Sequence, residues 1–231
     1  MRLLLVGYGR MGKLVERLAP DYGFEVVGRL DDTNNIGGAG IPSAPDADVA
    51  VEFSIPSAVA DNLPKLAARR MNVVIGTTGW HEHEAKMRTV AADAGIGVVA
   101  AANFSLGVAL FQNLAEQAAR VFAPYPQYGA WIHEIHHSAK KDAPSGTAMT
   151  LQTGMRAAGY PHHIDMASSR AGSVPGTHTI GFDGPFETIT MTHTNRDRAA
   201  FAQGALQAAK WVHGKRGWFG INDVLGLGAR D

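Results

Sequence analysis

A glycine-rich turn near the N-terminus constrains the fold of this chain more than any other feature. The apolar run at residues 3–6 leads directly into residues 7–12, which read GYGRMG and match the pattern G-x-G-x-x-G. In such a turn the first glycine allows a sharp bend, the second lets the backbone approach a pyrophosphate, and the third lets the following helix pack closely. An acid, Asp31, follows Gly12 by 19 residues. This context predicts a strand, turn and helix that bind a dinucleotide.

The N-terminal part of the chain alternates between short apolar runs and helical patterns. We expect strands at residues 3–6, 24–30, 48–53, 72–75 and 97–101, and helices at 13–18, 58–70 and 81–94. Strands and helices that alternate in this way form a doubly wound parallel sheet with right-handed connections. The sequence therefore predicts a Rossmann-like α/β domain.

The pattern changes after residue 105. We expect helices at Leu106–Phe122, 148–158 and Ala199–Val212, and strands at 128–137, 177–182 and 186–194. The later strands alternate between polar and apolar residues, which is typical of an open mixed or antiparallel sheet with one solvated face. We therefore expect a dinucleotide-binding domain of residues 1–104 and 199–231, and a smaller α+β domain of residues 105–198.

The composition excludes several classes of function. The chain has 231 residues, no cysteine and a formal net charge of zero. Without cysteine there is no disulfide, thiolate nucleophile or cysteine-ligated metal. The balanced charge gives no reason to expect a nucleic-acid or membrane partner. We expect a cytoplasmic protein, because a reducing compartment suits this composition.

Residues 133–148 combine three histidines, two lysines and a Pro-Ser-Gly-Thr turn. A site that binds a small anion and passes a proton to it needs that density of cationic donors. Adjacent residues on a strand point to opposite faces, so His136 and His137 are expected to serve different purposes. Residues 145–147 open a helix whose free amides form a cradle for a carboxylate, and Ser145 or Thr147 can also be its N-cap.

Other interpretations of these motifs stay open but are less favoured. A zinc site built from His133, His136 and His137, joined by residues 162 and 163, lacks a recognisable metal-ligand spacing, and the nearby lysines would repel a cation. We therefore expect no metal. A P-loop would need a hydroxyl at residue 14, where leucine stands. The central segment can also be a solvated loop rich in histidine and lysine.

Two adjacent carboxylates affect the choice of dinucleotide. Asp31 is expected to accept the hydroxyls of the adenosine ribose, and Asp32 adds a second negative charge that would repel a 2′-phosphate. No arginine or lysine follows immediately, although Arg10 and Lys13 could reach such a phosphate. The sequence therefore favours NADH over NADPH.

Several motifs together indicate a family. The most specific is EIHHSAKKDAPSGTA at residues 134–148, and others lie at residues 9–12, 76–79, 101–105, 170–172, 175–178, 187, 193 and 198–205. With these motifs the chain resembles the 4-hydroxy-tetrahydrodipicolinate (dihydrodipicolinate) reductases over nearly its whole length. The family's glycine turn usually has one more residue than the turn of this chain.

The resemblance implies roles for residues of the central motif. His136 would be the proton donor or acceptor, and Lys140 would be the proton donor beside it. His137 would bind a carboxylate of the substrate. The amides of Gly146 and Thr147, with the Thr147 hydroxyl, would bind a carboxylate as well.

The resemblance also implies a reaction. The family transfers hydride from NADH or NADPH to C4 of (4-hydroxy-)dihydrodipicolinate, with loss of water, and forms tetrahydrodipicolinate in lysine and diaminopimelate biosynthesis. The smaller domain would bind this small dicarboxylate and build a homotetramer, and Arg198 would support the substrate pocket. The residues expected to bind the cofactor are Gly7, Tyr8, Gly9, Arg10, Met11, Gly12, Asp31, Asp32, Gly76, Thr77, Thr78, Ala101, Ala102, Asn103 and Phe104.

Two functions of other kinds are alternatives. An amino-acid dehydrogenase of the aspartate type would share such a two-domain fold, but it has no need for the motif at residues 140–147. A dinucleotide sensor without catalytic activity would not need both His136 and Lys140.

Overall fold

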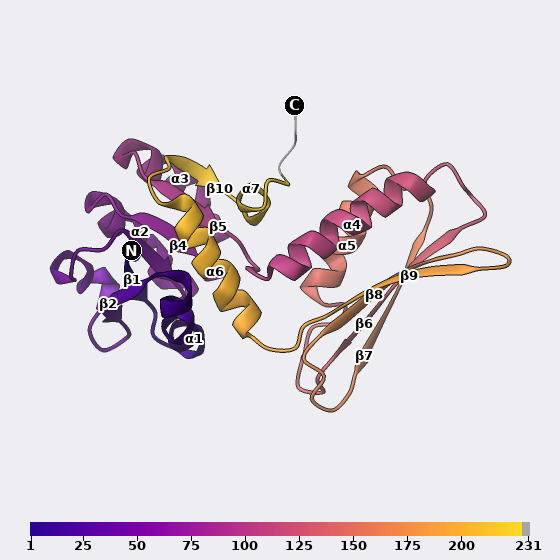
Figure 1. Ribbon diagram of the computed structural model, residues 1–231, viewed down its shortest axis with the longest axis horizontal. Coiled ribbons are helices and arrows are strands. Elements are labelled where there is room, and N and C mark those ends of the chain that lie inside the picture. The colour runs from indigo at the N-terminus through magenta and orange to yellow at the C-terminus, as the bar shows by residue number, and fades with distance from the viewer. Residues whose placement is uncertain (228–231) are drawn as a thin grey trace. The chain divides into compact units, whose positions relative to one another are not determined.

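The computed structural model describes residues 1–227 of the chain. They form two compact units (Figure 1). The first consists of Met1–Leu106 together with the chain from Arg198 onward, and the second of Gly107–Asp197. Each unit has its own sheet, and each buries its own set of apolar side chains.

A six-stranded parallel sheet forms the centre of the first unit. Its strands are β1 (Arg2–Val6), β2 (Glu25–Leu30), β3 (Val49–Glu52), β4 (Asn72–Ile75), β5 (Gly97–Ala100) and β10 (Gly217–Phe219). The order is β10-β5-β4-β3-β1-β2, and all neighbours are parallel. Since β2 lies on one side of β1 and β3 on the other, the topology switches direction there. Sheets of this kind bind ligands beside the switch, at the carboxyl ends of the strands.

Helices cover both faces of this sheet. They are α1 (Arg10–Leu18), α2 (Pro56–Ala68), α3 (Glu84–Ala94), α6 (Ala199–Val212) and the short α7 (Ile221–Val224), with 3₁₀ turns at Ala19–Tyr22, Ile36–Gly38, Ile41–Ser43 and His81–His83. Leu3 and Leu5 of β1 pack in one core with residues of α1 and α6. Leu4 and Val6 pack in another with residues of α2 and α3. Burial on both faces explains why the central strands β1, β3, β4 and β5 read as mostly apolar runs.

The second unit contains a four-stranded mixed sheet. Its strands are β6 (Gly129–His136), β7 (Ile164–Arg170), β8 (Thr177–Asp183) and β9 (Thr188–Thr194), and its helices are α4 (Leu106–Phe122) and α5 (Gly146–Ala157). In the order β7-β6-β8-β9, only β7 and β6 are parallel. Apolar residues of α4 and α5 form a core with those of β6 and β8. The predicted fold class, a Rossmann-like sheet plus a smaller α+β domain with an open mixed sheet, is confirmed.

Two short or irregular strands were not predicted. β7 reads IDMASSR, which shows no regular alternation, and only its pairing with β6 makes it a strand. β10 has three residues and depends in the same way on β5. In addition, α3 begins at Glu84 after a 3₁₀ turn rather than at residue 81, because residues 81–83 adopt the tighter turn first.

None of the helices within residues 1–227 has both the length and the apolar character needed to cross a membrane.

Candidate active site

The glycine turn leaves the N-terminus of α1 open. A Cβ atom on Gly7, which has φ +95°, would lie 2.1 Å from the carbonyl oxygen of Phe53, and one on Gly12 would lie 2.3 Å from that of Gly7. A side chain at either position would therefore displace backbone. Gly9 is the N-cap of α1, and a Cβ there would meet no atom within 4 Å. Since no side chain caps this helix, its first amides are available to a pyrophosphate.

A cavity of about 560 Å³ lies beside this turn. Residues that follow β1, β2 and β3 line it, and its ionisable lining consists of Tyr8, Asp31, Asp32 and Asp61, without lysine or arginine. The Asp31 carboxylate accepts hydrogen bonds from the hydroxyl of Thr33 at 2.6 Å and from its backbone amide at 2.9 Å. These bonds lower the pKa of Asp31. The cavity has the size and polarity to hold an adenosine, and it offers no cation to a 2′-phosphate.

The basic side chains near the turn have other partners. Arg29 binds the carboxylate of Glu16, which also accepts the hydroxyl of Tyr8. Lys13 Nζ lies 5.8 Å from the centre of the Tyr8 ring. Arg10 is exposed at the start of α1, and neither it nor Lys13 lines the cavity. The arrangement therefore leaves the carboxylates to determine the charge of the cavity.

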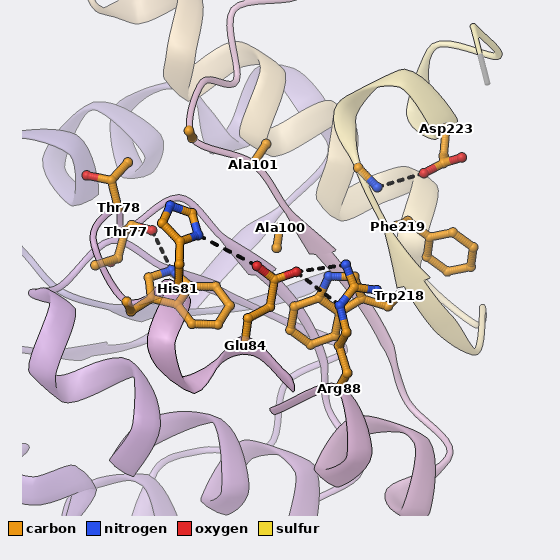
Figure 2. A pocket seen from close by; sticks show the side chains of 13 residues that line it. Thr77, Thr78, His81, Glu84, Arg88, Ala100, Ala101, Trp218, Phe219 and Asp223 are labelled. Atoms are coloured by element: carbon orange, nitrogen blue, oxygen red, sulfur yellow. Dashed lines mark hydrogen bonds and ion pairs between the residues drawn. The ribbon is translucent and has the colours of Figure 1, made fainter. Parts of the chain in front are cut away.

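A second cavity, of about 250 Å³, lies at the carboxyl ends of β4, β5 and β10 (Figure 2). Thr77 and Thr78 line it from the loop after β4, and Ala101 and Ala102 line it from the loop after β5. The hydroxyl of Thr77 is fixed, because it accepts the backbone amide of Ser54 at 2.9 Å. The structure thus brings together four of the residues that were predicted to bind the cofactor.

Other predicted cofactor residues contact the protein itself. The Phe104 side chain is buried and packs edge to face on Phe53, with ring centres 6.2 Å apart, so it can offer a cofactor only its backbone. Gly76 also adjoins Phe53, since a Cβ there would lie 1.9 Å from that ring. Asn103 accepts the amide of Ser105 at 2.8 Å through its side chain. Met11 packs partly into the core on the α6 side.

The second cavity has walls that the sequence analysis missed (Figure 2). The rings of Trp80 and Trp218 lie 6.1 Å apart, and Arg88 lies 4.9 Å above Trp218. Arg88 also binds Glu84 at 2.7 Å, and His81 approaches that carboxylate at 3.6 Å. His81, Glu84 and Arg88 follow one another at intervals of three and four residues, a spacing that could have indicated one helical face. No local pattern could have indicated Trp218, because pairing of β10 with β5 brings it there.

In the second unit, His136 ends β6 on the same side as Glu134. Its Nδ1 hydrogen bonds to the Glu134 carboxylate. That carboxylate also accepts two N–H groups of Arg170, at 2.8 and 2.9 Å, and the backbone amide of Ser145 at 3.2 Å. The Glu134 side chain has no exposed surface, and that of His136 is 12% exposed. A carboxylate on Nδ1 leaves Nε2 as the nitrogen that can exchange a proton with a ligand.

Burial and hydrogen-bond partners set the charges around His136. Burial alone would raise the pKa of Glu134. Hydrogen bonds from Arg170, Ser168 and His136, and the charge of His136, outweigh burial and lower the pKa to about 2. The His178 ring lies 5.1 Å from that of His136. Burial, and then the charge of His136, lowers the pKa of His178 to about 4. At neutral pH, Glu134 is therefore ionised and His178 is neutral.

Lys140 lies on the loop between β6 and α5. Its Nζ is 2.7 and 2.8 Å from the two carboxylate oxygens of Asp142, and this ion pair lowers the pKa of Asp142. The backbone amide of Lys140 donates to the carbonyl of His137 at 3.1 Å. The carbonyl of Asp142 accepts an N–H of Arg170 at 2.5 Å. The same guanidinium therefore contacts Glu134 and the loop that carries Lys140.

The N-terminus of α5 follows this loop. Ser145 is its N-cap, because its hydroxyl oxygen accepts the amide of Ala148 at 3.2 Å. That hydroxyl also lies 3.0 Å from Nε2 of His178. Gly146 and Thr147 are the first two residues of the helix, and the first amides of a helix have no partner within it. The sequence predicts that these amides bind a carboxylate, and the structure places them in the first turn of the helix.

Three side chains could also hold a metal ion. Glu134, His136 and His178 each place a donor atom within 4.8 Å of the other two. However, Arg170 already neutralises the carboxylate through two hydrogen bonds, and a cation would have to displace it. The Nε2 atom of His178 is engaged by Ser145. This geometry favours proton transfer over metal binding.

The histidines of the alternative zinc site do not point toward one another on β6. His133 and His136 lie three positions apart on the strand, so they point to opposite faces of it. His133 instead lies 3.0 Å from the hydroxyl of Ser169. His137 is partly buried at the start of the loop. Arg198, the N-cap of α6, is exposed and belongs to the first unit, whereas the other predicted substrate residues belong to the second.

These sites define a class of protein. The first unit has the open glycine turn and the acid at the end of β2 that bind a dinucleotide in Rossmann-like folds. The second presents an imidazole, an ammonium group and free helix amides, which suit proton transfer to a small anion. A chain with both is an oxidoreductase that uses a pyridine nucleotide.

Comparison with known proteins gives the family. Residues 1–104 match the family model for the N-terminus of dihydrodipicolinate reductase, and residues 107–225 match that for its C-terminus. A 4-hydroxy-tetrahydrodipicolinate reductase of Stenotrophomonas maltophilia is 38% identical over 239 residues, which cover 97% of this chain and 98% of the relative. One from Christiangramia forsetii is 35% identical over 236 residues, with the same two coverages. The chain belongs to the dihydrodipicolinate reductase family.

The fold agrees with that of a solved member. The dipicolinate-bound dihydrodipicolinate reductase from Paenisporosarcina sp. TG-14 is similar with a TM-score of 0.78. The match covers 95% of this chain and 97% of that one at 23% identity, so it supports the fold alone.

Proposed function

We propose that this chain reduces (4-hydroxy-)dihydrodipicolinate at C4, with loss of water, to tetrahydrodipicolinate in lysine and diaminopimelate biosynthesis. The observation that carries the proposal is the match of both units to the reductase family, over residues 1–104 and 107–225. The relatives from Stenotrophomonas maltophilia and Christiangramia forsetii are named for this reaction. In our proposal residues 1–104 and 199–231 bind the dinucleotide, and residues 105–198 bind the substrate.

The residues of the first unit fit a dinucleotide. The amides of Gly9 and of the first turn of α1 would hold the pyrophosphate, and Asp31 would accept the ribose hydroxyls. Thr77 and Ala101 would lie on the nicotinamide side, where both line the second cavity. When bound, the reduced nicotinamide supplies the hydride.

The second unit would supply the proton. Addition of hydride and loss of water together consume one proton, which a protein group beside the substrate can donate. In our proposal His136 donates from Nε2, and Lys140 is the ammonium donor beside it. A carboxylate of the substrate would bind His137 and the amides of Gly146 and Thr147. Arg198 would support substrate binding.

We propose that NADH is preferred over NADPH. The larger cavity contains the carboxylates of Asp31, Asp32 and Asp61 and no cation. Arg29, the nearest arginine before Asp31 in the sequence, is bound to Glu16. A 2′-phosphate would therefore meet like charges without a partner.

We also propose that the enzyme works in the cytoplasm as a homotetramer, as its family resemblance implies. The second unit exposes apolar side chains that suit contact with another copy. Phe186, in the hairpin before β9, is 99% exposed, and Ile189 of β9 is 45% exposed. Light scattering of the purified protein tests the assembly, and a monomer would contradict it.

The proposed reaction is tested by a coupled assay. The substrate is generated in situ from pyruvate and aspartate semialdehyde by the preceding synthase, and oxidation of NADH or NADPH is followed by absorbance. We expect oxidation that depends on the synthase and is faster with NADH. Absence of oxidation with either cofactor, in protein shown to be folded, would contradict the proposal. The same protein assayed with aspartate and NAD tests the amino-acid dehydrogenase alternative, which nothing in the comparisons favours.

A further inference from the structure

Glu134 occupies a position where an unpaired carboxylate would be costly. It lies near the end of β6, with Ser168 of β7 on one side and His178 of β8 on the other. Its side chain has no exposed surface. Burial of a charge in such a place is tolerated only when the charge is paired and hydrogen-bonded. The side chains and backbone groups that bind this carboxylate therefore indicate its role.

Those partners come from three separate parts of the second unit. Arg170 of β7 binds both carboxylate oxygens, at 2.8 and 2.9 Å. Ser145, at the start of α5, donates its backbone amide at 3.2 Å. His136, two residues along β6, binds through Nδ1. An ionised carboxylate only accepts hydrogen bonds, so the proton of His136 is held on Nδ1.

The opposite side of the imidazole faces Gly176. A Cβ on Gly176, whose φ is +140°, would lie 3.0 Å from Nε2 of His136. The ring of His178 packs edge to face at 5.1 Å on another side. The imidazole is thus held in one orientation, with Nδ1 on the carboxylate and Nε2 beside Gly176, where a side chain would crowd it.

Arg170 extends the same network to Lys140. One of its terminal nitrogens donates to Glu134 at 2.8 Å and to the carbonyl of Asp142 at 2.5 Å. The side chain of Asp142 binds the ammonium of Lys140. The guanidinium therefore connects Glu134, which binds His136, to Asp142, which binds Lys140.

We propose that Glu134 and Arg170 are positioning residues for the acid–base step, fixing the His136 proton on Nδ1 and holding the loop that carries Lys140. This inference rests on the proposed function, in which His136 and Lys140 transfer protons. Neither Glu134 nor Arg170 needs to touch the substrate. They act through His136 and Asp142, so their removal is expected to lower kcat while leaving NADH binding intact.

The first test replaces the carboxylate by an amide of the same shape. Glu134→Gln still offers one acceptor, but it can also donate, so it no longer forces the proton onto Nδ1. We expect kcat to fall on the order of 10²-fold, within the range that general acid–base catalysis supplies. The dissociation constant for NADH, measured by nicotinamide fluorescence, is expected to stay within about twofold, because the dinucleotide site lies in the first unit.

A spectroscopic readout separates positioning from simple loss of structure. The ¹⁵N signals of the His136 ring, assigned with His136→Asn, report which nitrogen carries the proton. We expect the Nδ1–H form in the wild type and its loss or mixture with Nε2–H in Glu134→Gln. This measurement needs no turnover. A wild type without reductase activity but with the Nδ1–H form would contradict the proposed function and leave the positioning role supported.

The pH profile of kcat provides a second readout. Charged or titratable groups around His136 include Glu134 on its own strand, Arg170 from β7, His178 from β8 with His193 of β9 behind it, and the pair of Lys140 and Asp142 from the loop. Glu134→Gln removes one negative charge from this set, so we expect the limits of the profile to move. A uniform loss of activity at every pH would instead indicate a structural role only.

Further variants distinguish loss of positioning from misfolding. Glu134→Gln leaves a partly buried guanidinium unpaired, whereas Glu134→Gln combined with Arg170→Met removes both charges, a change that buried pairs often tolerate. We expect this double variant to be folded and equally slow, and Arg170→Lys to retain part of the activity. Asp165→Asn, on the exposed side of β7, is the control for loss of a charge from the same sheet, with activity unchanged. Near-normal kcat in the double variant, or an unaltered His136 tautomer in Glu134→Gln, would overturn the proposal.

Discussion

At the scale of single residues, Glu52 and Glu134 are buried to the same extent but differ in their partners. Glu52, at the end of β3, is 1% exposed. Its partners are the neutral side chains of Ser54, Asn62 and Thr77, and burial raises its pKa. Its second oxygen has no hydrogen-bond partner within residues 1–227. Glu134 has a guanidinium against it, and its pKa is lowered. The presence or absence of a cation therefore decides the direction in which the pKa of a buried carboxylate moves here.

Glu134 is expected to make the protein sensitive to acid. Its pKa falls from 4.5 to about 2 on folding, so its stabilising contribution is present above pH 4.5 and is lost as the pH falls toward 2. A shift of this size corresponds to on the order of 3 kcal/mol. The free energy of unfolding in urea, measured from pH 7 down to pH 3, should therefore fall less steeply in Glu134→Gln than in the wild type. Parallel curves would contradict the ion pair.

His136 is the residue whose removal should affect turnover most directly. His136→Ala is expected to lower kcat by about 10²- to 10⁴-fold, because the proton donor is lost, while the NADH dissociation constant changes little. His133→Ala is the matched control, since His133 lies on the same strand but points to the opposite face and contacts Ser169. Equal effects of the two substitutions on kcat would show that His136 is not the proton donor.

Asp32 is expected to control the choice of cofactor. Asp32→Arg places a cation beside the larger cavity, where the wild type has only carboxylates. We expect the ratio of kcat/KM for NADPH to that for NADH to rise on the order of tenfold, or about 1.4 kcal/mol. Asp32→Asn, which removes the charge without adding another, should give a smaller rise. An unchanged ratio in both would mean that Arg10 or Lys13 sets the preference.

At the scale of elements, the sequence predicts most of the fold because its patterns are local. The central strands β1, β3, β4 and β5 are short, mostly apolar runs, and Leu106–Phe122 and Ala199–Val212 are helices with the predicted bounds. β7 could not be predicted, because its polar sequence becomes a strand only beside β6. For the same reason the role of Arg170 was missed. It lies 36 residues after Glu134, and parallel pairing of their strands brings the two side chains together.

The N-terminus of α5 offers a test at this scale. Ser145→Ala removes the hydroxyl that caps the helix and that lies against His178. We expect the free energy of unfolding to fall by about 1 kcal/mol, as is typical for loss of an N-cap, with weaker substrate binding because the amides of Gly146 and Thr147 lose their support. Thr150→Ala, which removes an exposed hydroxyl bound to the carbonyl of Gly146 on the same helix, is the control and should change neither.

At the scale of the whole molecule, the two kinds of chemistry are divided between two units. The glycine turn and both cavities described above belong to the first unit, and His136, Lys140 and the start of α5 belong to the second. Each unit has a core of its own. Each candidate site is therefore built mainly by one unit, and we expect each unit to bind its own ligand.

Hydrogen exchange tests this division directly. A ligand at a hundred times its dissociation constant stabilises the state that binds it by about 2.7 kcal/mol. We expect NADH to slow exchange of the amides in the glycine turn, the start of α1 and the loops after β4 and β5. Dipicolinate, a planar dicarboxylate that resembles the proposed substrate, should slow exchange at residues 137–147 and the start of α5. His136→Ala should retain the response to NADH. If NADH alone protected the start of α5, or dipicolinate alone protected the glycine turn, the assignment of the two sites to the two units would be wrong.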